Sequence, residues 1–117
     1  MLATKHVTLT DTTLQQIFAI PNGFLAHITY VFIANHGGST NSIDLYWDDN
    51  SVPQVYIFDG TTVTQGDRVT LGNNGGPLFV LHEGETIQAQ ASGAGNFEVV
   101  ITFDLQYNPF GFTNFNQ

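Results

Sequence analysis

The sequence predicts an all-β protein, a two-sheet antiparallel sandwich in the form of a jelly roll of about eight strands, with extended N- and C-terminal arms. Apolar side chains alternate with polar ones in several segments, which is the period of a strand with one buried face. Gly, Pro and Asn interrupt the chain at intervals too short for helices. Closing two Greek keys into a jelly roll shields the edges that many short strands would otherwise expose.

The clearest strand is predicted for residues 97–107. Its alternate positions are apolar and share one face: Phe97, Val99, Ile101, Phe103, Leu105 and Tyr107. Mostly polar residues occupy the positions between them, so the strand is expected to bury one face only. The segment 43–48 repeats the alternation and places Trp47 on its apolar face with Ile43 and Leu45.

Residues 24–35 are apolar on both faces, which predicts a central strand covered on both sides. Six further strands are predicted at residues 6–10, 15–20, 54–58, 67–71, 77–81 and 86–91. The segments between them are rich in the residues that turns favour.

The 117 residues fit one domain, with the sandwich over residues 1–107 and an aromatic arm over residues 108–117. Phe110, Phe112 and Phe115 lie in this arm and are predicted interaction residues, because exposed phenylalanines are a liability on a free tail. Two alternatives stay open: the arm folds back over its own sandwich, or it docks onto a neighbouring subunit. The amino terminus lacks the layout of a secretion signal and is expected to be the mature terminus, with residues 1–6 as a second contact.

The charge balance excludes several partners. Ten acidic residues oppose only Lys5 and Arg68, for a formal net charge of −8, and such a field repels nucleic-acid phosphates and anionic lipid. No apolar run is long enough for a membrane-spanning helix. With no cysteine, disulfides and thiolate chemistry are excluded for this chain. A surface poor in lysine and glutamate is typical of protein interfaces, which favours self-association.

The segment His82-Glu83-Gly84-Glu85 resembles a metal site at first sight. The adjacent Asp48 and Asp49 lack the alternating spacing of a calcium loop, and His82 lacks a partner histidine at a zinc-motif spacing. We therefore expect no metal and no cofactor, and we interpret the segment as a solvated corner between two strands. No nucleophile motif is present either, so no catalytic residue and no enzyme activity are predicted.

Sugar binding is an alternative from a different class. Tyr46 and Tyr56 lie within ten residues of Trp47, and aromatic faces flanked by Asp and Asn suit sugar rings. Because Trp47 shares the apolar face of its strand, we place it in the core. Tyr46 and Tyr56 are the surface candidates for a glycan contact.

The order of elements resembles small virion structural proteins of tailed bacteriophages. The resemblance covers residues 7–105 and lies in turn patterns: a strand ending in Pro-Asn-Gly, a long strand ending in Asn35, and the corner at Leu81–Ile87 followed by an Ala/Ser/Gly hairpin into the last strand. The usual acid after the corner glycine in this group is aspartate, where this chain has Glu85.

This resemblance implies a jelly-roll capsid decoration (cement) protein, or a tail or fibre adaptor or knob protein, located on the virion. Such proteins are usually oligomeric, often trimers, and contact the major capsid protein or other virion proteins. The resemblance carries over no catalytic residue.

Overall fold

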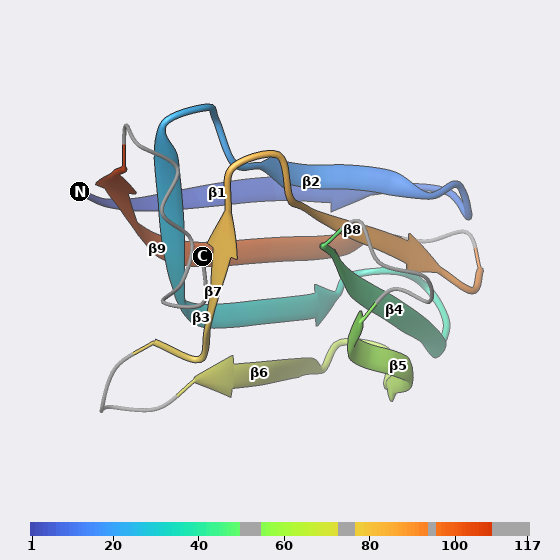
Figure 1. Cartoon of the computed structure of the whole chain (residues 1–117). Helices are drawn as coiled ribbons and strands as arrows, with labels where there is room; N and C mark the ends of the chain where they lie inside the picture. The colour runs from blue at the N-terminus through green and yellow to red at the C-terminus, as the bar shows by residue number, and fades with distance from the viewer. Residues whose placement is uncertain (50–54, 73–76, 94–95, 109–117) are drawn as a thin grey trace.

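The computed structural model describes residues 1–49, 55–72, 77–93 and 96–108. Within these residues nine strands form two antiparallel sheets packed as a sandwich, and no helix is long and apolar enough to cross a membrane (Figure 1). The strands are β1 (Leu2–Leu9), β2 (Gln15–Ala19), β3 (Phe24–Asn35), β4 (Asn41–Asp48), β5 (Val55–Val63), β6 (Arg68–Gly72), β7 (Phe79–His82), β8 (Thr86–Ala91) and β9 (Phe97–Tyr107).

The strand order confirms the predicted sandwich. One sheet has the order β1-β9-β3-β6, and β7 continues the position of β6 along the same side of β3; the other sheet has the order β2-β8-β4-β5. The chain changes sheet after β1, β2, β3, β5, β7 and β8. This alternation interleaves two Greek keys and is the arrangement of a jelly roll.

The alternation in β9 has the predicted consequence as far as Phe103, whereas Tyr107, predicted on the same face, is 71% exposed. Phe97, Val99, Ile101 and Phe103 are all buried in the core, while the side chains between them lie on the outer face of the sheet. β9 pairs with β1 on one side and with β3 on the other, so it is a central strand. Its apolar face therefore supplies the middle of the core between the two sheets.

β3 is central, as predicted, but the prediction that both its faces are covered is wrong. A β-bulge at Thr29 shifts the register against β9, so Ala26 and Ile28 face inward before it and Val31 and Ile33 after it. An extra residue reverses which alternate positions face the core. Apolar residues consequently occur at both even and odd positions although only one face is buried, and Tyr30 on the outer face is 40% exposed.

The N-terminal segment is an edge strand and not an extended arm, which corrects the prediction. β1 begins at Leu2 and pairs with β9 along its whole length, from Leu2 opposite Asp104 to Leu9 opposite Phe97. The Met1 ammonium donates to Asp104 Oδ1 at 2.6 Å, and Leu105 N–H donates to the Met1 carbonyl. Residues 1–6 are therefore part of the sheet.

The segment 82–85 is a corner, as interpreted from the sequence. It joins β7 in one sheet to β8 in the other, between the fully buried Leu81 and Ile87. Gly84 has a φ of +83° and donates its N–H to the Ile20 carbonyl at 3.1 Å, while Ile20 donates to the Glu85 carbonyl at 3.0 Å. The corner is thus hydrogen-bonded to the chain that leaves β2.

We expect Gly84→Ala to lower the free energy of unfolding by about 1–2 kcal/mol, because an L-residue in the left-handed region is strained. Gly38→Ala is the matched control: a Cβ meets no atom within 4 Å at either position, and only Gly84 has a positive φ. Urea unfolding of both variants measures the difference. Equal stabilities of the two variants would contradict a conformational role for Gly84.

Candidate functional site

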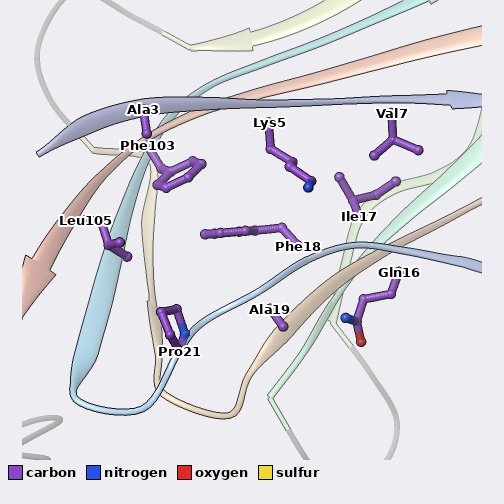
Figure 2. A pocket seen from close by; sticks show the side chains of 10 residues that line it. All are labelled: Ala3, Lys5, Val7, Gln16, Ile17, Phe18, Ala19, Pro21, Phe103 and Leu105. Atoms are coloured by element: carbon purple, nitrogen blue, oxygen red, sulfur yellow. The ribbon is translucent and has the colours of Figure 1, made fainter.

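An open groove lies between the free edges of the two sheets, where β1 and β2 run beside each other (Figure 2). Its volume is about 550 Å³. β1, β2 with the turn after it, and β9 supply the lining side chains: Ala3, Lys5, Val7, Gln16, Ile17, Phe18, Ala19, Pro21, Phe103 and Leu105. The groove exposes part of the sandwich interior at its edge.

The groove is apolar because of the register of the strands around it. β1 directs its odd-numbered side chains inward, so Ala3 and Val7 pack against the core. In β2 the register shifts between Gln16 and Phe18, and the two adjacent residues Ile17 and Phe18 both face the interior. The Phe18 ring lies against the Phe103 ring at a centroid distance of 4.2 Å.

Lys5 is the charged group of this groove. It occupies the inward-facing position of β1 between Ala3 and Val7, and its side chain projects into the groove (Figure 2). An inward-pointing charge on an edge strand discourages unselective pairing with other strands. The ammonium can also attract the face of a further aromatic ring through a cation–π interaction.

Carboxylates on β9 hold β1 in place. The N-terminal ammonium donates a hydrogen bond that, with a second one from Gln106, keeps the pKa of Asp104 below its ordinary range. Burial raises the pKa of Glu98, but hydrogen bonds from His6 and Thr8 and the charges of His6 and His36 together outweigh it, so the net pKa is lowered. Asp104 and Glu98 are therefore both ionised at neutral pH, and both bind the N-terminal segment that forms one wall of the groove.

Glu85 is not the solvated corner acid that the sequence suggested. Its Oε1 accepts hydrogen bonds from the His82 N–H at 2.8 Å and from Trp47 Nε1 at 3.2 Å, and its side chain is largely buried. His82 has a partner too, since its Nδ1 lies 3.6 Å from the same oxygen. Glu83 is exposed, as expected, and accepts from the Gly23 N–H at 3.3 Å.

Trp47 packs against the core, as predicted from its face of β4. Its ring stacks on Phe79 at a centroid distance of 5.3 Å, with an interplanar angle of 19°. Together with the bond to Glu85, this contact connects β4 to the corner after β7. Among the described residues, no group of three or more His, Asp or Glu side chains is placed to hold a metal ion.

Tyr46 and Tyr56 lie next to each other on the outer face of the β4–β5 pair. Their rings meet edge to face at 4.8 Å, and the Tyr46 hydroxyl donates to Gln90 Oε1 at 3.2 Å. Tyr46 is only 7% exposed, so its ring is covered by its neighbours, whereas Tyr56 is 48% exposed. Burial, followed by the charge of Asp44, raises the pKa of Tyr46.

A polar hollow of about 370 Å³ lies on the outer face of the same sheet. It is lined by Thr12, Ser42, Asp44, Gln90, Ala91 and Ser92. Asp44 accepts the Gly60 N–H at 2.6 Å, and Gln90 Nε2 donates to the Thr12 carbonyl at 3.0 Å. Gln90 also accepts from Tyr46, which connects the hollow to the tyrosine pair.

Phe110, Phe112 and Phe115 lie outside the described residues. The last described residues show where their segment starts: Asn108 donates its N–H to the Gly23 carbonyl in the turn between β2 and β3. Pro21 in that turn lines the groove. Asn108, the last described residue, therefore lies near one end of the groove.

Sequence reasoning missed the groove as a site. The signal it overlooked is the pair Ile17-Phe18, two large apolar residues in succession that break the alternation of β2. A second signal is Lys5, which is charged at an inward position of a strand whose other inward residues are apolar.

The sequence matches no protein family and no characterised protein. One similar solved structure comes from a description of Bacillus endospore appendages as a novel family of disulfide-linked pili; its TM-score is 0.51 at 13% identity, covering 92% of this chain and 88% of that chain. Another is the Drosophila NLP core, described for pentamer formation and histone binding, with a TM-score of 0.49 at 16% identity, covering 86% of this chain and 97% of that chain. At 13% identity the likeness to the appendage protein establishes the fold alone.

We expect Glu85→Ala to destabilise the fold by about 2 kcal/mol, because it leaves two donors without their charged acceptor. The emission of Trp47, the single tryptophan, is expected to change at the same time. Glu83→Ala is the control on the same corner, since its carboxylate makes one long bond to an exposed turn. Urea unfolding followed by fluorescence compares the two, and a similar loss in both would contradict the role of Glu85.

We expect part of the stability of β1 to depend on pH through Glu98. A carboxyl group with a lowered pKa stabilises the fold above its ordinary pKa, about 4.3 for glutamate, and this contribution is lost as pH falls through the folded-state value. The stability gap between the wild type and Glu98→Gln should thus be present above about pH 5 and narrow below about pH 4. Denaturant unfolding at several pH values measures it; a gap that stays constant over this range would count against the linkage.

Proposed function

We propose that this chain is a non-enzymatic structural protein of a bacteriophage virion, and specifically a capsid decoration (cement) protein that bridges capsid subunits as a homo-oligomer. The observation that carries the proposal is the open apolar groove on the edge of a jelly roll. A groove with mostly apolar walls and a few polar groups is a usual form of a binding site. The jelly roll is an architecture that viral capsid domains use.

The surface chemistry supports a role in assembly. Lys5 and Arg68 are the only Lys and Arg residues of the chain, so long flexible cations that oppose burial are nearly absent from it. The Bacillus appendages with a similar fold form disulfide-linked pili. This chain has no cysteine, so its assembly would depend on non-covalent burial of surface.

Cryo-electron microscopy of particles assembled with and without this chain tests the proposal. We expect added density over the boundaries between capsid subunits and heads that resist a higher temperature when the chain is present. Density on the tail alone would favour the alternative of a tail or fibre adaptor or knob protein. Particles that are identical with and without the chain would overturn a virion role.

A carbohydrate-binding module is the second candidate, and the polar hollow beside the tyrosine pair favours it. Asp44, Gln90 and Ser42 offer carboxylate, amide and hydroxyl groups that suit sugar hydroxyls, and the exposed Tyr56 offers a ring next to them. Jelly rolls also serve as lectin domains. A glycan array with the isolated chain separates the two candidates, since sugar binding that Asp44→Ala abolishes would favour the module over a pure cement protein.

A further inference from the structure

We infer that the groove between β1 and β2 is the receptor for Phe110 and Phe112 from the C-terminal segment of a second copy of this chain. The inference rests on the proposed self-assembly and names the two surfaces that would meet. It assigns the groove to a peptide of aromatic and neutral polar residues, and it gives these two phenylalanines a place of burial.

The chemistry of the groove suits a phenylalanine side chain. Its floor holds the Phe18–Phe103 pair, its wall holds Ala3 and Val7, and both are apolar. An added ring can make the tilted or edge contacts that aromatic pairs prefer. The Lys5 ammonium projects into the same space, where it can lie over the face of that ring.

The segment after Asn108 has matching chemistry. Residues 109–117 carry no charged side chain and contain three phenylalanines. In an extended segment Phe110 and Phe112 point to the same side, about 7 Å apart, while Phe115 points to the opposite side. Two rings can therefore enter one groove together, and the third cannot enter with them.

The edge of β1 favours the binding of an extended peptide. β1 uses one side of its backbone to pair with β9, and within the described residues no strand pairs with its other side. A segment laid along this edge can add backbone hydrogen bonds as a further strand, while alternate side chains fill the groove. This mode of recognition needs the alternation that Phe110 and Phe112 provide.

The length of the chain argues for a second copy and against the chain's own tail. Phe103 lies five residues before Asn108 on β9, a distance of about 17 Å along the strand. Phe112 lies four residues after Asn108, and a reversal of direction uses about two of them, which leaves its backbone roughly 10 Å short of Phe103. The tail of the same chain could thus bring only Phe115 to the ring pair, whereas a second copy is free of this limit.

The proposed contact is head-to-tail, and it builds either a closed ring or an open filament. The tail and the groove are different surfaces, so each copy gives one and receives one in a head-to-tail arrangement. Such contacts close into rings when the rotation between neighbours allows it.

Sedimentation velocity of the full chain over a concentration series tests the inference. We expect Phe110→Ala/Phe112→Ala to raise the dissociation constant about tenfold or more, because buried aromatic anchors dominate interface energies. Phe115→Ala is the matched control and should leave the constant nearly unchanged. Ala3→Glu, which puts a carboxylate into the groove, should weaken association as the double variant does.

Two further measurements keep the result independent of folding. Thr4→Glu adds the same charge to β1 on its outer face and should still associate, and thermal unfolding shows whether each variant is folded. A synthetic peptide of residues 108–117 should dissociate the wild-type oligomer by occupying its grooves. The same peptide with both Phe110 and Phe112 replaced by alanine should not.

Each contrary outcome has a definite meaning. Self-association that survives both the double variant and Ala3→Glu overturns the inference and leaves the proposed function intact. A wild-type chain that is monomeric at every concentration overturns it as well, and so does a loss of association confined to Phe115→Ala. Failure of the proposed function would appear separately, in particles that do not contain the chain.

Discussion

The antiparallel pairing of β3 with β9 is the interaction on which the rest of the sandwich depends. These two strands pair from Phe24 opposite Tyr107 to Asn35 opposite Phe97, and β1 and β6 attach to their outer sides. The inward side chains of both strands form the middle of the core. Within the described residues β1 pairs with no strand other than β9, so the wall of the groove depends on this pairing, and the hydrogen bonds of Met1 to Asp104 and of His6 to Glu98 add to it.

The alternation of the sequence predicted the strands that obey a strict period of two and failed where an extra residue interrupts it. β9 and the corner at Gly84 followed directly from side-chain pattern and turn chemistry. The bulge at Thr29 was not predictable, because a register shift is decided by the partner strand and not by local preference. The same reason explains why the groove was missed: the bulge in β2 turns Phe18 toward the interior, and only the meeting of β1 with β2 makes an open space there.

The corner shows how a residue typical of the surface can serve packing. Glu85 occupies a turn, where acids are usually solvated, yet its oxygen bonds the first residue of the turn and the indole of Trp47. That single acceptor joins the end of β7 to β4 in the opposite sheet. Glutamate reaches one methylene farther than aspartate, and its bond to the indole uses this reach.

The open groove on the edge of the sandwich leaves apolar side chains in contact with water, and binding of a further chain would cover them. The Phe18 ring and the half-buried Ala3, Val7 and Leu105 would bury more surface if a further side chain covered them, and about 25 cal/mol is gained for each Å² of apolar surface removed from water. In the isolated chain, the inward-pointing charge of Lys5 opposes unselective pairing of this edge with other strands. A peptide that places an aromatic ring against the Lys5 ammonium gains a cation–π attraction. The same residue can therefore disfavour pairing with most strands and favour a strand that carries phenylalanine. A net charge of −8 adds long-range repulsion between copies, which makes a short-range, well-fitted contact the more suitable means of association.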